Sequence, residues 1–237
     1  MRPLPLAFAL WLVAATGLAS GAAAQSFDIS IRGLRAGSLD LAGEIEGGRY
    51  ALSGRLESRG LLGAIRSFRY DATTRGRVRD GRFVPEVYEE RGRRGDRATR
   101  SVVNYEKGVP SPRLREPARE RDSDALDPAT QAGTVDLLTG IWGLLRDVSR
   151  EAACNYRAEM FDGEKRSRVI TGEPTVEGET ITCTGEYRRL GGFSAEEMAE
   201  KQRFPFRLTY RPGADGLMEV ARIEMDTVFG TGVMTRR

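Results

Sequence analysis

Apolar and polar residues alternate along most of the chain, and this alternation is typical of β-strands with one buried face. Between residues 27 and 32, for example, Phe27, Ile29 and Ile31 fall on the apolar side. The other strands predicted in the first half are Ser38–Ile45, Arg49–Arg59, Ser67–Val78, Arg82–Arg91 and Ser101–Tyr105. Asp80-Gly81 lies between two of these strands and favours a two-residue hairpin turn. We therefore expect an antiparallel meander.

The alternation resumes after Cys154 and predicts a second series of strands. These strands are Asn155–Phe161, Lys165–Thr171, Thr180–Tyr187, residues 204–210 and Leu217–Val228. Turn dipeptides separate the first three of them, at Asp162-Gly163 and Glu177-Gly178. Ser194 is followed three residues later by Glu197, a capping-box pattern that predicts a short helix.

A helical spacing of apolar residues separates the two series of strands. Asp127 is a favourable N-cap, and Pro128 suits the first position of a helix. The apolar stripe that follows consists of Val135, Leu138, Trp142, Leu145 and Val148, widened by Leu137, Ile141 and Leu144. A helix that is apolar on most sides must be covered by other elements. We expect a helical hairpin covered by the concave face of the sheet.

These elements together predict an α+β fold in a single domain, residues 25–237. The fold is a highly curved antiparallel β-sheet, either a half-barrel or an open barrel, wrapped around a central apolar helical region. The segment Lys107–Leu126 combines Pro110, Pro112 and Pro117 with dense charge. Because proline cannot donate a hydrogen bond to a sheet, we expect this segment to be an exposed connection.

Residues 1–24 have the layout of a secretory signal peptide. Arg2 supplies a positive charge, an apolar run extends from Leu4 to Val13, and small residues end at Ala24. We expect cleavage after Ala24 and a mature protein in the periplasm. No later stretch reaches the roughly 18 apolar residues of a membrane-spanning helix, so we expect no transmembrane segment in the mature chain.

Composition limits the chemistry that the chain can perform. Histidine is absent, which excludes a Ser-His-Asp or Cys-His catalytic apparatus. The 37 basic residues include only three lysines, at 107, 165 and 201. An excess of arginine suits the recognition of phosphate or carboxylate groups, but it also follows from codon use in a GC-rich genome. We expect no cofactor, and no residue is assigned a catalytic role.

The two cysteines, Cys154 and Cys183, predict a structural disulfide. An exported chain with an even number of cysteines normally oxidises them. A redox-active pair would usually be spaced as Cys-x-x-Cys, and the separation here is far wider.

Two charged clusters have both a functional and a structural interpretation. Three aspartates, Asp124, Asp127 and Asp136, flank one loop-to-helix junction. In the functional interpretation they bind a metal ion together. In the structural interpretation they serve separately, as a helix cap and as solvated loop residues. We expect no metal site. The basic stretch from Arg91 to Arg100 is either a patch for anionic lipid headgroups or a charged hairpin loop. It contains no aromatic residue, which disfavours binding to single-stranded nucleic acid.

Several short motifs occur together in an order that resembles one bacterial family. They are the segment from Asp124 to Asp136, Phe161-Asp162-Gly163, Cys183-x-Gly185-x-Tyr187, Gly192-Phe193 and the opening stretch from Phe27 to Arg59. This set resembles the exported proteins catalogued as domain of unknown function 3108, over nearly the whole mature chain. The resemblance implies an uncharacterised periplasmic or envelope protein of Gram-negative bacteria and supplies no catalytic residues. More loosely, the expected fold is similar to periplasmic lipoprotein carriers, which hold acyl chains in a half-barrel.

The sequence therefore favours a non-enzymatic exported protein that binds an apolar, lipidic or other envelope component. The alternatives are a periplasmic scaffold for envelope integrity and a hydrolase that uses carboxylates. The expected partner is a lipid or an envelope protein rather than a nucleic acid, and the oligomeric state stays open. The residues expected to line an apolar site are Phe27, Ile29, Ile141, Leu145, Phe204 and Phe206. The same residues would otherwise pack against one another in a filled core.

Overall fold

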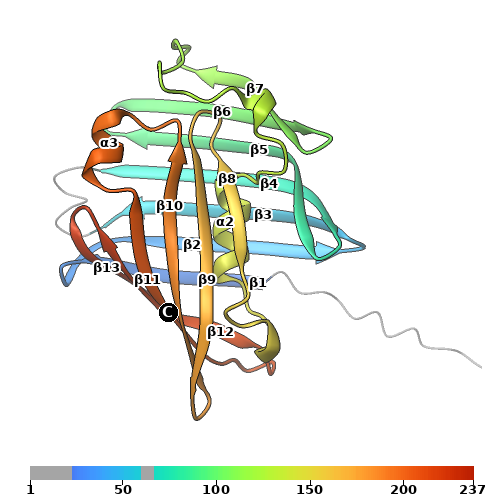
Figure 1. Cartoon of the computed structure of the whole chain (residues 1–237), viewed down its shortest axis with the longest axis vertical. Coiled ribbons are helices and arrows are strands. Elements are labelled where there is room, and N and C mark those ends of the chain that lie inside the picture. Colours follow the sequence, from blue (N-terminus) through green and yellow to red (C-terminus); the bar gives the residue numbers. More distant parts are fainter. Residues whose placement is uncertain (1–22, 60–66) are drawn as a thin grey trace, which may run out of the picture.

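The computed structural model describes residues 23–59 and 67–237, and strands dominate it (Figure 1). Within the described residues, thirteen antiparallel strands form one sheet in the order β7-β6-β5-β4-β3-β2-β1-β13-β12-β11-β10-β9-β8. The strands of the first half are β1 (Ala23–Ile31), β2 (Leu34–Glu46), β3 (Arg49–Ser58), β4 (Phe68–Arg79), β5 (Arg82–Arg94), β6 (Arg97–Glu106) and β7 (Val109–Glu116). Those of the second half are β8 (Arg157–Phe161), β9 (Arg166–Glu177), β10 (Thr180–Gly191), β11 (Arg203–Pro212), β12 (Met218–Thr227) and β13 (Gly230–Arg236). The predicted signal peptide lies outside the described residues except for its last two, Ala23 and Ala24.

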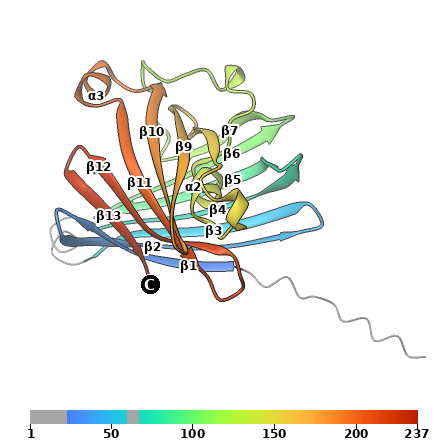
Figure 2. The same cartoon turned by 60° about the horizontal axis from the view of Figure 1, so that its bottom comes forward.

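The sheet curves until it nearly closes into a barrel. Its two halves are joined where β1 pairs with β13, in a register that begins at Phe27 and Arg236 and ends at Ile31 and Gly232. In both views the strands β9–β11 cross over the first half of the sheet (Figures 1 and 2). The edges of the sheet are β7 and β8, which do not pair with each other. The expected curved antiparallel sheet is confirmed, and the protein is predominantly β.

The helical part is smaller than the sequence pattern predicts. The helical elements of the described chain are η1 (Pro128–Thr130), α2 (Leu137–Leu145), η2 (Arg150–Ala152) and α3 (Ala195–Glu200), the last with the expected capping box at Ser194 and Glu197. The prediction of a helical hairpin is therefore wrong. The pattern from Val135 to Val148 is longer than the helix because both of these residues form β-bridges, Val135 with Met160 and Val148 with Met218.

Two strands lie where the pattern predicts none. β7 occupies the segment expected to be an exposed connection, and it contains Pro110 and Pro112. Proline is tolerated there because β7 is an edge strand, which pairs only with β6 and needs fewer backbone donors. β13 is rich in glycine and threonine and lacks a clear alternation, which explains why its sequence gives little strand signal.

The chain between β7 and α2 closes the seam between the two edges of the sheet. Backbone hydrogen bonds join Gly133 to Gly108 near β7, and join Val135 to Glu159 in β8, each at 2.9 Å. The carboxylate of Glu164, beside β9, accepts contacts from Arg115 and Arg119 on the β7 side, both at 2.7 Å. The seam is thus held by loop hydrogen bonds and ion pairs instead of a strand-to-strand ladder.

Helix α2 packs tightly against β3, β4 and β8. Trp142 and Leu145 are almost fully buried, with 3% and 2% of their surfaces exposed. Two glycines allow this close approach, since a Cβ atom at Gly140 would lie 2.2 Å from the sulfur of Met160. A Cβ atom at Gly143 would lie equally close to the hydroxyl oxygen of Tyr156. The two glycines therefore let α2 pack in close contact with Met160 and Tyr156.

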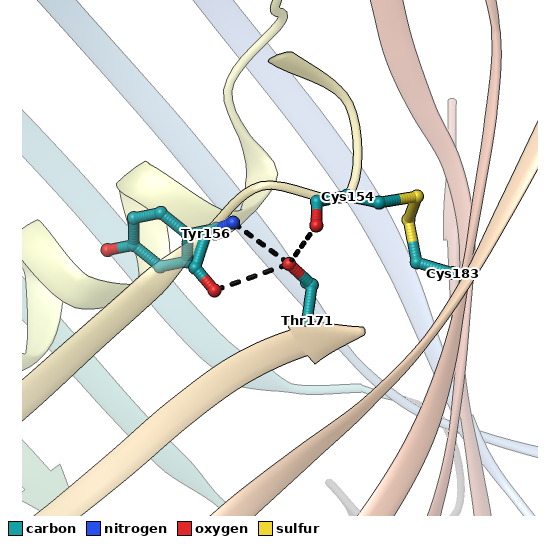
Figure 3. Close-up of a disulfide and its surroundings, with 4 residues drawn as sticks. All are labelled: Cys154, Tyr156, Thr171 and Cys183. Atoms are coloured by element: carbon teal, nitrogen blue, oxygen red, sulfur yellow. Dashed lines mark hydrogen bonds between the residues drawn. A yellow bond between two sulfur atoms is a disulfide. The ribbon is translucent and has the colours of Figure 1, made fainter. Parts of the chain in front are cut away.

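The expected disulfide joins Cys154, which follows η2, to Cys183 in β10, with a Cα–Cα distance of 5.5 Å (Figure 3). Cys154 has a φ of 63°, a left-handed conformation that is unusual outside glycine. The hydroxyl of Thr171 lies 2.8 Å from the carbonyl oxygen of Cys154 and accepts a hydrogen bond from the backbone N–H of Tyr156 at 2.9 Å. Thr171 thus supports the unusual backbone beside the disulfide.

Replacing Cys183 with serine should lower the free energy of unfolding by about 3–4 kcal/mol, because the link constrains 29 residues of the unfolded chain. Urea denaturation of the oxidised wild type and of Cys183→Ser measures the difference. The control is the wild type in reducing buffer, which should match the variant. Equal stability of oxidised wild type and variant would contradict a stabilising role for the disulfide.

Replacing Trp142 with alanine should destabilise the fold by about 3–5 kcal/mol, through lost burial and the cavity that remains. Trp142→Phe should be much milder because it keeps most of the packed surface. Thermal and urea unfolding of the two variants provide the comparison. A loss of less than about 1 kcal/mol in Trp142→Ala would show that α2 is not part of the main core.

Candidate functional site

The most deeply buried charged side chain belongs to Asp136, which is fully enclosed at the start of α2. Its Oδ1 accepts the backbone N–H of Thr139 at 2.8 Å, as an N-cap does. Its Oδ2 accepts hydroxyl hydrogen bonds from Thr139 at 2.7 Å and from Thr74 of β4 at 2.9 Å. Burial raises the pKa of the Asp136 carboxyl, and these hydrogen bonds oppose that rise.

Tyrosines surround this carboxyl and extend the polar cluster. The Tyr50 hydroxyl lies 3.2 Å from the hydroxyl of Thr139, and the Tyr156 hydroxyl donates to the carbonyl of Gly140 at 2.9 Å. Burial raises the pKa of Tyr50, Tyr105 and Tyr156, and the negative charge of Asp136 adds to each rise. The Tyr105 hydroxyl has no hydrogen-bond partner among the described residues. These tyrosines are therefore neutral at ordinary pH and serve as hydrogen-bonding and packing groups.

The surroundings of Asp136 suit a structural role better than a catalytic one. A carboxylate-dependent hydrolase needs two acids that converge in an accessible cleft. The partners recorded for Asp136 are the two threonines, and its side chain has no exposed surface. The cluster fixes the start of α2 against β4.

The three aspartates considered for a metal site do not come together. Asp127 caps η1 by accepting the N–H of Ala129 at 3.0 Å, and Asp124 is exposed. Asp136 is enclosed at the start of α2. Across residues 23–59 and 67–237, no three His, Cys, Asp or Glu side chains are placed to hold a metal ion.

The residues expected to line an apolar site occupy different surroundings. Phe27, Leu145 and Phe206 belong to one buried core cluster, and Ile29 packs against it. Phe204 is also buried, with its ring 5.5 Å from that of Tyr187, which packs against the same cluster. Ile141 is 38% exposed on α2. Binding of a ligand by this set stays a prediction, since the structure packs half of it into the core.

Two hollows stand out on the described part of the molecule, and both lie at the surface. The smaller, about 560 Å³, lies between β7 and η1 beside Lys107, Pro110 and Asp127. The larger, about 830 Å³, crosses the ends of β4, β5, β6 and β7. We call the larger one the arginine groove, because its lining includes Arg69, Arg91, Arg93 and Arg100, with Thr99 and Glu116.

Strand alternation explains the composition of the arginine groove. Tyr88 of β5 points into the core, so the odd-numbered residues Glu89, Arg91 and Arg93 lie on the outer face. The register then aligns them with outer-face residues of neighbouring strands: Arg93 lies opposite Arg69. The sequence pattern identified the stretch from Arg91 to Arg100 but missed the contributions of β4 and β7. Only the strand pairing shows that Arg69 and Glu116 belong to the same surface.

The charges of the groove are partly compensated. Glu89 forms ion pairs with Arg91 and Arg100, both at 2.9 Å, and hydrogen bonding from these arginines holds the pKa of Glu89 below its usual value. Arg69 pairs with Asp71 at 2.6 Å and lowers the pKa of that carboxyl. Arg93 forms no ion pair with any described residue. The Arg93 guanidinium is therefore exposed and free of an ion pair with the described residues.

The described fold is that of a β-barrel-like protein, and the comparisons with known proteins agree with this fold. The sequence matches the family described as "Protein of unknown function (DUF3108)" over residues 26–237. The chain belongs to this family, as its motifs predicted. A comparison with curated proteins finds no matching sequence.

One similar solved structure supports the fold alone. It is the β-barrel-like protein of the domain of unknown function DUF1849 from Brucella abortus, with 15% sequence identity and a TM-score of 0.53. The alignment covers 90% of this chain and 95% of that one. None of the helices in the described ranges has the length and apolar character needed to cross a bilayer.

The raised pKa of Asp136 predicts a specific pH dependence of stability. Folding raises the pKa of this carboxyl, so the folded protein binds the proton more tightly than the unfolded chain does. The stability gained from this proton is fully present below the unfolded pKa of about 3.9. It is lost as the pH rises through the higher pKa of the folded state. Asp136→Asn should remove this loss while keeping a competent cap. Urea denaturation at about pH 4.5 and about pH 8 should show the wild type losing more stability, relative to the variant, at the higher pH. Parallel pH profiles for the two proteins would contradict a raised pKa.

Proposed function

We propose that this protein is a non-enzymatic, periplasmic envelope protein that binds an anionic group of a lipidic or other envelope component in the arginine groove. The observation that carries the proposal is the groove itself, about 830 Å³ in volume and lined by four arginines. Pockets for small ligands usually measure about 300–1,000 Å³. A guanidinium presents several donors in one plane and matches phosphate and carboxylate groups.

Side chains of α2 occupy the interior in this proposal, which supports binding at the surface instead. In this proposal the curved sheet wraps α2 as a central support, and Trp142 and Leu145 fill the space beneath the strands. A ligand held inside would have to displace these side chains. A ligand on the outer face of β4–β7 requires no rearrangement of the core.

The proposed periplasmic location rests on two features: the signal-peptide layout of residues 1–24 and the disulfide between Cys154 and Cys183. Disulfides persist in oxidising compartments such as the bacterial periplasm. A purely scaffolding role is the alternative, and it predicts no saturable binding of small anions.

Titration calorimetry with inorganic phosphate and with glycerol 3-phosphate tests the groove. We expect saturable binding that weakens as salt is added, because the contact is between charges. Arg91→Gln combined with Arg93→Gln should weaken binding by about tenfold or more, equivalent to about 1.4 kcal/mol. The matched control is Arg79→Gln with Arg82→Gln in the β4–β5 hairpin, at the opposite ends of these strands, which should bind as the wild type does.

An absence of saturable binding to either anion would overturn the proposal and favour the scaffold. Equal losses in the groove variant and the control variant would also contradict it, since binding would then depend on overall charge. Unfolding measurements on both variants exclude a trivial loss of structure.

A further inference from the structure

Three hairpin turns and two strand ends of the described chain lie at one end of the barrel. The β1–β2 turn at Arg32-Gly33, the β5–β6 turn at Gly95-Asp96 and the β12–β13 turn at Val228-Phe229 all lie there, as do the start of β4 and the end of β7. Figure 1 shows these hairpin ends along the left edge of the molecule. The arginine groove opens at the same end, because its lining comes from the last residues of β5 and the first residues of β4 and β6.

Two large apolar side chains are exposed on adjacent turns of this end. Leu34 is 59% exposed and Phe229 is 68% exposed. The turns that carry them are neighbours because β1 pairs with β13, and the N–H of Arg32 donates to the carbonyl of Thr231 at 2.9 Å. Arg32 and Gly33 both have positive φ, as in a two-residue type I′ turn, so Leu34 follows directly on a tight tip.

Basic charge lies on the same end. Residues 91–100 contain five arginines and a single acidic residue, Asp96. No ion pair with a described residue is formed by Arg93, Arg94 or Arg97. Within the described chain, the Arg94 guanidinium donates to the Tyr70 hydroxyl at 3.4 Å. These charges are therefore available to an anionic partner outside the molecule.

We propose that this end of the barrel docks on the surface of an anionic lipid bilayer, with the Leu34 and Phe229 side chains entering the headgroup region and the arginines of residues 91–100 contacting phosphates. The inference rests on the proposed function and names the partner of the arginine groove. Exposed apolar side chains beside basic residues are the combination by which peripheral proteins bind anionic membranes.

A bilayer fits these features better than a protein partner does. Stable protein interfaces bury broad complementary surfaces, on the order of 800 Å² per partner. Among the described residues at this end, the large exposed apolar side chains are Leu34 and Phe229, which lie on two separate tips. A fluid lipid surface accepts isolated apolar side chains of any shape, and its phosphates accept arginine contacts along the whole edge.

Vesicle flotation tests the docking surface, with vesicles of phosphatidylcholine alone and of phosphatidylcholine mixed with phosphatidylglycerol. The protein is prepared without residues 1–24, since that apolar segment would itself bind lipid. We expect binding to the mixed vesicles, weakened by salt, and little binding to phosphatidylcholine alone. Leu34→Ser with Phe229→Ser should reduce binding by at least tenfold.

The chain offers a matched control for each class of variant. Val176→Ser removes an apolar side chain that is 54% exposed on the β9–β10 hairpin and should leave vesicle binding unchanged, because this hairpin lies at the strand ends opposite the β12–β13 turn. Arg94→Gln with Arg97→Gln should reduce binding several-fold. Arg79→Gln with Arg82→Gln, an equal loss of charge at the opposite strand ends, should not.

The outcomes separate this inference from the proposed function. If glycerol 3-phosphate binds in the groove but vesicles do not bind, or bind without dependence on Leu34 and Phe229, the bilayer is the wrong partner while the groove stands. If neither binds, both proposals fail. Self-association that the Leu34→Ser, Phe229→Ser variant abolishes, without vesicle binding, would assign these tips to a second copy of the chain and overturn the inference.

Discussion

The pairing of β1 with β13 is the constraint on which the rest of the structure depends. It joins the first and last strands of the chain, from Phe27 opposite Arg236 to Ile31 opposite Gly232, and so makes one sheet of two meanders. Arg236 reinforces the junction through a hydrogen bond to Asp147 at 3.0 Å. Contacts so distant in sequence carry a large cost in loop entropy, which the buried core must offset. The same junction places the turns at Leu34 and Phe229 side by side.

Closure of the sheet also decides which side chains form the interior. Once the two halves face each other, the inner side chains meet α2 and one another, and close contacts at Gly140 and Gly143 leave little room. A buried carboxylate is acceptable in such an interior only when it is hydrogen-bonded, and Asp136 meets this condition as the cap of α2.

Much of the local structure could be predicted from the sequence. Alternation located most strands, Asp80-Gly81 forms a turn with both residues at positive φ, and Ser194 with Glu197 forms the capping box. Local patterns failed where tertiary pairing competes with helix formation. Val135 and Val148 fit a helical stripe, but each pairs with a strand instead. The strand propensity of the edge strand β7 is hidden by Pro110 and Pro112, because the advantage of an edge position is not visible in the sequence.

For the candidate sites, the sequence by itself determined the chemistry available: arginine in place of lysine, no histidine, two cysteines and a basic stretch from Arg91 to Arg100. The tertiary structure alone decided which of these groups meet. Strand register aligned Arg69 with Arg93 to form the groove, and the β1–β13 junction brought Leu34 and Phe229 to the same end. It also separated Asp124, Asp127 and Asp136 and enclosed the last of them. The physical reason is that residue type and periodicity are local properties, whereas register and barrel closure depend on the packing of the whole core.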